Sequence, residues 1–322
     1  MSDSQILDQL AADYARLRAE IAKIIVGQDA AVDSLLNAVF SGGHCLLIGV
    51  PGLAKTLIVN TLSRTLGLQF SRIQFTPDLM PSDITGAEIL DENRRFKFLK
   101  GPLFANIVLA DEINRTPPKT QSALLEAMQE HAVTVSGTSY PLPAPFFVLA
   151  TQNPIEQEGT YPLPEAQLDR FMLDVVLEYP SFEEELQVVK TTTVDREANI
   201  DVILSAAQIL DYQRVIRKMP LVDNVCDYAV RLVASTRPDK TEQRNPQRVA
   251  DKYISWGAGP RASQYLVMGA KTHAAFHGKY APDIEDVRAV AVEVLRHRLV
   301  RNYYAEAEGV TTDTIITELM KL

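Results

Sequence analysis

The feature that constrains this chain most is an apolar run that leads into a glycine-rich loop and then into a helix. The run is His44-Cys45-Leu46-Leu47-Ile48, and it is typical of a strand buried on both faces. The loop that follows is Gly49-Val50-Pro51-Gly52-Leu53-Ala54-Lys55-Thr56. Backbone N–H groups at a helix start attract phosphate, so this order predicts a loop that holds nucleotide phosphates. Lys55 would add a positive charge, and the Thr56 hydroxyl could bind magnesium.

The loop departs at one position from the GxxxxGK[ST] pattern of phosphate-binding loops. Ala54 stands where the second glycine belongs. Alanine fits there if the residue has right-handed helical dihedrals, because only a positive φ would demand glycine. The alternative for the segment as a whole is a glycine-rich turn that binds no nucleotide.

Polar residues follow two other strand candidates. Asp111 and Glu112 end the apolar run Ile107–Ala110, and Asn153 comes after Phe146–Ala150. Asp111 would hold the magnesium, Glu112 would orient and deprotonate the attacking water, and Asn153 would contact the γ-phosphate or that water. The alternatives are a strand that simply ends in solvent and, for Asn153, an asparagine that starts a turn before a proline.

The strand candidates alternate with helical stretches, which predicts a parallel five-stranded α/β sheet with helices on both faces and ligands at the carboxyl ends of its strands. The remaining strand candidates are Gln69–Phe75 and Phe171–Val176. We expect this domain to cover residues 1–180, with an N-terminal helix that ends near Val26-Gly27 and a second helix at Asp29–Ser41 that Gly42-Gly43 stops.

The second part, residues 181–322, lacks strand signals and is predicted to be an all-helical lid domain. Its amphipathic segments are 182–195, 205–218, 223–236, 262–277 and 283–300. We expect Asp283, which follows a proline, to cap the last of them. His273 and His277 lie four residues apart on one of these helices, but without a third ligand we expect ordinary surface or interdomain residues.

Two insertions interrupt the α/β pattern and are predicted to be β-hairpins. They cover residues 87–98 and 131–140.

Composition limits the partner classes. The net charge of −9 disfavours a general electrostatic grip on nucleic acid, although Arg94, Arg95, Lys97 and Lys100 form one basic cluster. The two cysteines, Cys45 and Cys226, are far apart, which fits a reducing cytoplasm. The N-terminus lacks the features of a signal peptide, and no apolar run is long enough to span a bilayer.

The motifs together resemble the AAA+ ATPases, with GVPGLAKT as Walker A, LADE as Walker B and Asn153 as sensor 1. The segments LADEINR, LLEAMQE, ATQNP, EAQLDRF and GPRAS resemble the MoxR family within that class, in the same order and over nearly the whole chain. The resemblance implies that Val26-Gly27-Gln28 borders the adenine. It also implies that the two hairpins are those which point at the ring pore in MoxR proteins, magnesium chelatase motor subunits and MCM helicases; the alternative is a structural hairpin without substrate contact.

The resemblance also assigns arginines. It makes Arg170 the arginine finger that reaches the nucleotide of the adjacent subunit, and Arg261 the sensor 2 residue that contacts the γ-phosphate in its own subunit. A surface pair of Asp169 with Arg170, and an ordinary helix-start arginine at 261, are the alternatives. Because the helix dipole disfavours a cation at a helix start, something else should hold Arg261. Arg115 is a weaker candidate that faces a neighbour or the pore, or is an exposed loop residue.

The expected site can be stated residue by residue. The catalytic residues would be Lys55, Glu112, Asn153 and Arg170, and the magnesium ligands Thr56 and Asp111. The residues expected to bind ATP are Val26, Gly27, Gln28, Gly49, Val50, Pro51, Gly52, Leu53, Ala54, Lys55, Thr56, Leu57, Asp111 and Arg261.

The expected function is magnesium-dependent ATP hydrolysis by a cytoplasmic homo-oligomer, most often a hexameric ring in this class. The resemblance implies chaperone-like remodelling or maturation of a client complex, including cofactor or metal insertion, together with a separate von Willebrand A domain protein. Two alternatives remain: a nucleic-acid motor related to MCM, and a nucleotide-gated binding module with slow hydrolysis. The sequence does not name the client or its pathway.

Overall fold

The computed structural model describes residues 2–90, 92, 94–153, 159–193, 199–239, 245 and 247–321. Asp91 and Asn93 of the predicted first hairpin, and Asp195 at the expected end of a helix, lie outside these residues. Contacts divide the chain into two compact units. The α/β unit consists of Ala12–Pro164 and Val175–Asp211, and the helical unit of Met1–Ala11, Glu165–Asp174 and Tyr212–Leu322. The expected domain boundary at residue 180 stays a prediction.

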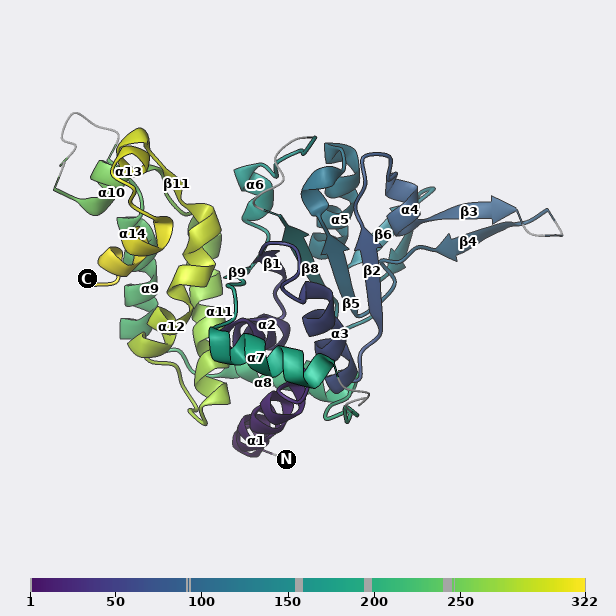
Figure 1. The fold of residues 1–322 in the computed structure, drawn as a ribbon, viewed down its shortest axis with the longest axis horizontal. Coiled ribbons are helices and arrows are strands. Elements are labelled where there is room, and N and C mark those ends of the chain that lie inside the picture. The colour runs from purple at the N-terminus through teal and green to yellow at the C-terminus, as the bar shows by residue number, and fades with distance from the viewer. Residues whose placement is uncertain are drawn as a thin grey trace. The chain divides into compact units, whose positions relative to one another are not determined.

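A five-stranded sheet organises the α/β fold, as predicted. The strand order is β2-β5-β8-β1-β9 (Figure 1), and the β2/β5, β5/β8 and β8/β1 pairs are parallel. β5 is fully buried, whereas the edge strand β2 is partly exposed rather than covered like the others. The strands are β1 (Cys45–Ile48), β2 (Phe70–Gln74), β5 (Ile107–Asp111), β8 (Phe147–Gln152) and β9 (Leu173–Val176).

Helices connect these strands. Gly42 ends α2 in the left-handed conformation and its N–H donates to the carbonyls of Ala38 and Val39, as the Gly42-Gly43 pair predicted. α1 ends at Ile21 rather than near Val26-Gly27, because the backbone tightens into a turn in which Ile24 N bonds to Ile21 O. The helices are α1 (Asp3–Ile21), α2 (Asp29–Ser41), α3 (Lys55–Thr65), α4 (Pro81–Thr85), η1 (Ile113–Arg115), α5 (Pro118–Glu130), α6 (Glu165–Leu168) and α7 (Phe182–Thr192).

Both predicted hairpins are confirmed. The first pairs β3 (Gly86–Leu90) with β4 (Phe96–Lys100), and the second pairs β6 (Ala132–Val135) with β7 (Thr138–Pro141). The first hairpin projects away from the sheet (Figure 1). At its base the rings of Phe98 and Tyr140 stack with centroids 4.1 Å apart, so the two hairpins support each other.

The predicted lid domain, residues 181–322, is rich in helices as expected, and it also contains one short pair of strands. β10 (Ile254–Trp256) pairs antiparallel with β11 (Val300–Arg301). Strands of two or three residues are too short to show a period of two, so no pattern of residues indicates them. The helices in the second half are α8 (Ala206–Lys218), α9 (Asp223–Ser235), α10 (Val249–Tyr253), α11 (Pro260–Phe276), α12 (Ile284–Leu295), η2 (Arg296–Arg298), α13 (Tyr303–Ala307) and α14 (Thr312–Leu319).

Asp283 caps α12 as predicted, because its side chain accepts a hydrogen bond from Asp286 N. Among the described residues, no helix combines the length and the apolar character that crossing a membrane requires.

Candidate functional site

The glycine-rich loop lies between β1 and α3, so the predicted order of strand, loop and helix is confirmed. α3 begins at Lys55. Ala54, directly before it, has φ 55° and ψ 23° and is therefore left-handed. The condition under which alanine would fit there, right-handed helical dihedrals, is therefore not met. The loop turns into α3 through a conformation that favours glycine, and this chain accepts the strain of an alanine there.

Lys55 lies across the loop. Its Nζ donates to Gly49 O at 2.6 Å. Partial burial lowers the pKa of Lys55, while the negative charges of Asp111 and Glu112 act to raise that pKa. The three charged groups therefore lie near one another at the carboxyl ends of β1 and β5, as the motifs predicted for a single site. The neighbouring Thr56 is half-buried in the first turn of α3.

Asp111 is the last residue of β5, and two neighbouring strands hold its carboxylate. Arg72 of β2 donates to Asp111 Oδ2 through Nη2 at 2.7 Å and Nε at 3.1 Å. Thr151 of β8 donates from Oγ1 to Asp111 Oδ1 at 2.6 Å. Asp111 is buried, with 8% of its surface exposed, and these donors satisfy its carboxylate oxygens inside the protein.

The Glu112 carboxylate is held separately. Glu112 is left-handed, with φ 56°, and its N–H donates to Thr151 Oγ1 at 2.8 Å. Gln74 Nε2 and Arg115 Nη1 each donate to Glu112 Oε2 at 3.0 Å. Arg115, whose position the sequence left open, therefore pairs with the expected catalytic carboxylate of its own chain. One buried threonine thus bridges Asp111 and Glu112.

Sequence reasoning missed Arg72, Gln74 and Thr151. A signal was present, because each is a polar residue near the carboxyl end of a strand that neighbours β5 or β1. What the sequence could not supply was the strand order that brings these residues beside Asp111 and Glu112.

Asn153 follows β8 and is buried, with 6% of its surface exposed. The preceding residue, Gln152, is the register partner of Ile48, and its carbonyl accepts from Gly49 N at 3.4 Å. Asn153 therefore lies beside the start of the glycine-rich loop. Pro154, which follows it in sequence, lies outside the described residues.

The segment Val26-Gly27-Gln28 lies against the chain that leads from β9 into α7. Gln28 Nε2 donates to Glu178 O at 3.0 Å. Gly27 has φ 72°, and a Cβ atom there would lie 2.8 Å from Cδ of Glu184. The positive φ favours glycine at this position, and any larger residue would also have to displace the Glu184 side chain.

Arg170 and Arg261 both belong to the helical unit. Arg261 is in the first turn of α11, where the helix dipole opposes a cation, and its Nη1 lies 3.2 Å from Asp169 Oδ2. The expected partner for Arg261 is therefore Asp169. Arg170 is half-buried, and its carbonyl accepts from Tyr265 Oη at 3.2 Å. Asp169 pairs with Arg261 and Arg298.

The oxygen donors for a metal fit magnesium by their chemistry. Thr56 offers a hydroxyl and Asp111 a carboxylate, and Mg²⁺ prefers oxygen ligands with part of its shell left to water and phosphate. Among the described residues, no group of three or more His, Cys, Asp or Glu side chains could hold a metal ion. His273 instead forms a 2.7 Å contact with buried Asp286, and its ring lies 4.3 Å from that of His277.

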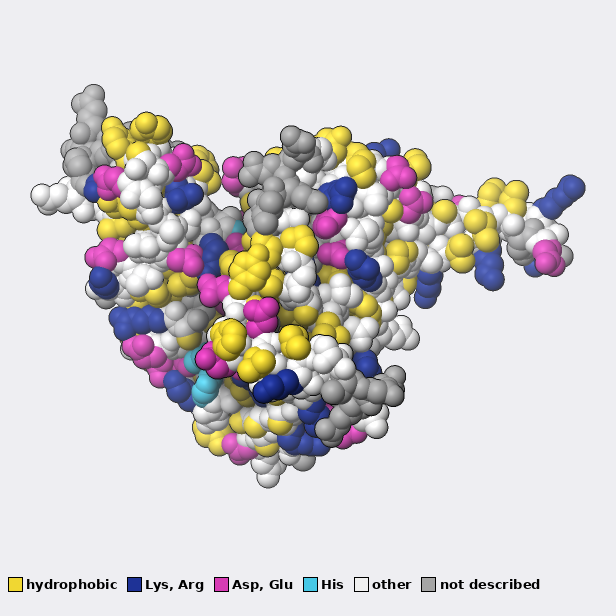
Figure 2. All heavy atoms as spheres, viewed as in Figure 1, with side chains coloured by type: hydrophobic (Ala, Val, Ile, Leu, Met, Phe, Trp, Pro, Cys, Tyr) yellow, Lys and Arg dark blue, Asp and Glu magenta, His cyan; other side chains and the backbone are white. Residues whose placement is uncertain are grey.

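The β3–β4 hairpin exposes both apolar and basic side chains. Phe96, Leu90 and Leu99 are 74%, 59% and 58% exposed. Figure 2 shows hydrophobic side chains in yellow and Lys and Arg side chains in dark blue along this hairpin, at the right of the view. A surface of this composition can contact an extended chain through both apolar and charged groups.

Two protein-family models match the chain. The ATPase family associated with various cellular activities (AAA) matches residues 44–173, and the AAA lid domain matches residues 247–319. Chaperone MoxR1 of Mycobacterium tuberculosis is 45% identical over 303 residues, which cover 94% of this chain and 79% of that protein. Protein MoxR of Methylorubrum extorquens is 31% identical over 310 residues, covering 88% and 87%.

A solved structure agrees over almost the whole length. The crystal structure of a Cytophaga hutchinsonii protein, described as a candidate ATPase, superposes with a TM-score of 0.89 at 43% identity. The match covers 98% of this chain and 96% of that one.

Proposed function

Since the chain belongs to the MoxR family of AAA+ ATPases, we propose that it hydrolyses ATP with Mg²⁺ in a ring of identical subunits. We propose further that hydrolysis drives chaperone-like remodelling or maturation of a protein partner. The observation that carries the first proposal is the cluster of Lys55, Asp111 and Glu112 at the carboxyl ends of β1 and β5, in which Thr151 Oγ1 donates to the Asp111 carboxylate and accepts from Glu112 N.

Each residue of the cluster has a task that its position supports. Lys55 and the backbone N–H groups of Gly49–Leu57, except Pro51, which has none, would bind the phosphates. Thr56 and Asp111 would hold the magnesium, which would supply positive charge to the phosphates. Glu112 accepts the proton of the attacking water, and Asn153 orients that water or the γ-phosphate.

The present contacts define what must change for these tasks. Lys55 must exchange the Gly49 carbonyl for phosphate oxygens, which is favourable because the new partner is an anion. Glu112 must release Arg115 and Gln74 to face the water. The Glu112 carboxylate is therefore held by Gln74 and Arg115, and we propose that it is released only when nucleotide is bound.

The ring follows from the proposed roles of the arginines. Arg170 would reach the nucleotide of the adjacent subunit, and a site shared in this way needs a head-to-tail interface, which closes into a ring; we propose six subunits. Arg261 would contact the γ-phosphate of its own subunit, and Val26-Gly27-Gln28 would border the adenine. We also propose residues 1–180 as the nucleotide-binding domain and 181–322 as the lid.

The partner is proposed from the family. Chaperone MoxR1 carries that role in its name, and we propose a client protein complex for this chain, with a separate von Willebrand A domain protein and with cofactor or metal insertion as one form of maturation. We propose that it works in the cytoplasm. A nucleic-acid motor is not favoured, because the net charge is −9.

Three variants test the ATPase proposal. Lys55→Ala should lose nucleotide binding, whereas Glu112→Gln and Arg170→Ala should bind ATP and hydrolyse it poorly. Arg64→Ala, a change in the last turn of α3, is the matched control for loss of a positive charge and should keep normal turnover. Wild-type turnover in Glu112→Gln would refute the assignment of the base.

The same Glu112→Gln variant separates motor from timer. If it supports the partner's activity while bound to ATP, nucleotide binding alone is sufficient and hydrolysis only times release. If the partner's activity is lost, hydrolysis drives the work.

A further inference from the structure

The segment that carries Arg170 is held by a buried arginine from elsewhere in the chain. Arg298, in η2, has 1% of its side chain exposed. It donates from Nε to Asp169 Oδ1 at 2.8 Å and from Nη2 to Asp169 O at 3.0 Å. It also donates to Phe171 O at 2.5 Å and to Met172 O at 3.2 Å. The residues on both sides of Arg170 are therefore fixed by one guanidinium.

Neighbouring groups complete this hold. Tyr265 of α11 donates its hydroxyl to Arg170 O, and the Arg298 guanidinium lies over the Tyr265 ring, 5.1 Å from its centre. His297 Nε2 donates to Phe171 O at 3.1 Å. The backbone of Arg170 is thus attached to α11 and η2, both parts of the helical unit.

Asp169 joins this segment to Arg261. Its Oδ1 accepts from Arg298 and its Oδ2 from Arg261. The Asp169 carboxylate therefore lies between the buried Arg298 and Arg261, whose side chain is 42% exposed. If Arg261 turns to a phosphate, Oδ2 loses its partner while Oδ1 stays bound. A movement of Arg261 would consequently change the hydrogen bonding of Asp169, the residue directly before Arg170.

We propose that Arg298 and Asp169 are positioning residues that lock the Arg170 segment to the helix bearing Arg261, so that the two arginines respond to nucleotide as one body. This inference rests on the proposed roles of Arg170 in the adjacent site and of Arg261 in its own site. It adds a path by which ATP in one subunit alters the arginine offered to the next.

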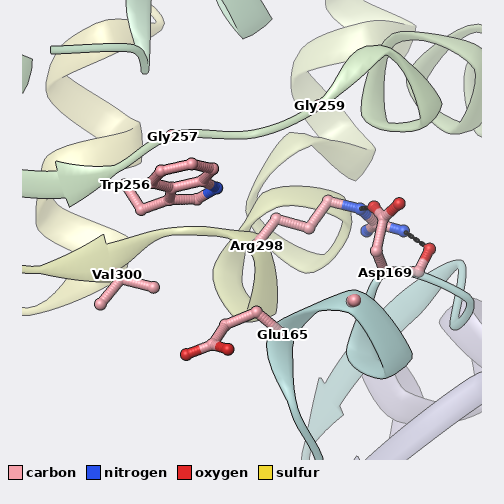
Figure 3. A pocket seen from close by; sticks show the side chains of 8 residues that line it. Glu165, Asp169, Trp256, Gly257, Gly259, Arg298 and Val300 are labelled. Atoms are coloured by element: carbon pink, nitrogen blue, oxygen red, sulfur yellow. Dashed lines mark hydrogen bonds and ion pairs between the residues drawn. The ribbon is translucent and has the colours of Figure 1, made fainter.

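The chain contains its own reporter for this change. Trp256, its only tryptophan, lines a cavity of about 520 Å³ together with Glu165, Asp169 and Arg298. Figure 3 shows the indole and the Arg298–Asp169 pair around this cavity, with residues from β10, η2 and α6. Because indole emission responds to nearby charge, Trp256 should sense the release of Arg261 from Asp169.

The kinetic test compares Arg298 with Arg296, the other arginine of η2. Arg298→Lys keeps the positive charge but cannot reproduce the planar set of donors. It should lower kcat about a hundredfold, the effect expected when a catalytic group is displaced by roughly 1 Å, with little change in the half-saturating ATP concentration. Arg296→Lys is the control, since Arg296 pairs with Asp313 and the carbonyl of Asp174 but makes no bond to residues 169–172. Near-normal kcat in folded Arg298→Lys, or an equal loss in Arg296→Lys, would overturn the proposal.

The spectroscopic test needs no turnover. A non-hydrolysable ATP analogue should change Trp256 emission in the wild type and in Arg170→Ala, and should leave it unchanged in Asp169→Asn that still binds the analogue. An unaltered response in Asp169→Asn would contradict the shared carboxylate as the link. Thermal unfolding of each variant shows whether the protein being measured is folded.

Mixed rings separate this inference from the function on which it rests. Glu112→Gln subunits have an intact Arg170, so mixing them with Arg170→Ala subunits should restore turnover above the sum of the two alone. Arg298→Lys should be restored to the same extent, because its defect is in the arginine it offers and not in its own catalytic acid. If turnover is restored with Arg170→Ala but not with Arg298→Lys, this inference is wrong while the proposed role of Arg170 stands. If turnover is restored with neither variant, the proposed role of Arg170 is wrong.

Discussion

Replacing Ala54 by glycine should stabilise the α/β unit, because Ala54 is left-handed in the glycine-rich loop. An L-residue in this conformation costs about 1–2 kcal/mol. Glycine relieves that strain but increases the entropy of the unfolded chain, which offsets about 0.4–1 kcal/mol. Ala54 is exposed, so the loss of its methyl group removes little buried surface. We expect a net gain of about 0.5–1 kcal/mol in the free energy of unfolding.

The matched control is the same substitution in a right-handed helix. Ala12 is exposed within α1, and Ala12→Gly should lower the free energy of unfolding by about 1 kcal/mol. Both residues belong to the α/β unit. The two variants should therefore shift in opposite directions from the wild type, a contrast that does not depend on the absolute stability.

Urea unfolding followed by far-ultraviolet circular dichroism measures both changes at equal protein concentration and without nucleotide. A midpoint for Ala54→Gly above that of the wild type, with an unchanged slope, supports the strain argument. If Ala54→Gly loses as much stability as Ala12→Gly, the loop does not hold Ala54 in a strained conformation in solution, and the reasoning is refuted.

Three further predictions concern single residues of the α/β unit. Burial lowers the pKa of His44 from the ordinary 6.5 to about 4, so between these values the unfolded chain binds a proton that the folded chain does not, and the free energy of unfolding falls as the pH decreases. Between about pH 7 and pH 5, urea unfolding of His44→Gln should therefore show a loss of stability about 2 kcal/mol smaller than that of the wild type. Equal losses in the two proteins would contradict this. Thr151→Val removes the hydroxyl that donates to Asp111 and accepts from Glu112 N, and should lower both kcat and the free energy of unfolding, the latter by about 2–3 kcal/mol. Thr151→Ser keeps the hydroxyl and should retain both quantities. A valine variant as active as the serine variant would argue against a functional role for this hydroxyl. Gly27→Ala should lower the free energy of unfolding by about 1–2 kcal/mol, because φ is positive and the new Cβ meets Glu184; thermal unfolding that matches the wild type would show that the loop adjusts.

Much of the fold could be predicted because its signals are local. Each strand of the central sheet is a short apolar run, and α2 was predicted with its correct bounds from Asp29 to Ser41, since Gly42 ends it. The short pair of β10 and β11 was missed because a strand of two or three residues carries no detectable local signal.

The candidate site was predictable only in part. Lys55, Asp111 and Glu112 stand out because their types and positions after strands are rarely explained by structure alone. Their roles, and those of Asn153, Arg170 and Arg261, remain predictions for the experiments above. Arg72 and Gln74 were missed because an arginine and a glutamine on an edge strand look like ordinary surface residues until the strand order is known.

The sequence by itself determined which segments become strands, helices and the phosphate-binding loop, since these depend on residues within a few positions of one another. Only the tertiary structure decided what surrounds the charges. Arg72 meets Asp111 across 39 residues, and Arg298 meets Asp169 across 129. The left-handed backbone of Ala54 was likewise decided by the tertiary structure and not by the local sequence. Such contacts arise from the order of strands and the packing of helices, where a charge can be buried only if a partner from a distant part of the chain arrives to compensate it.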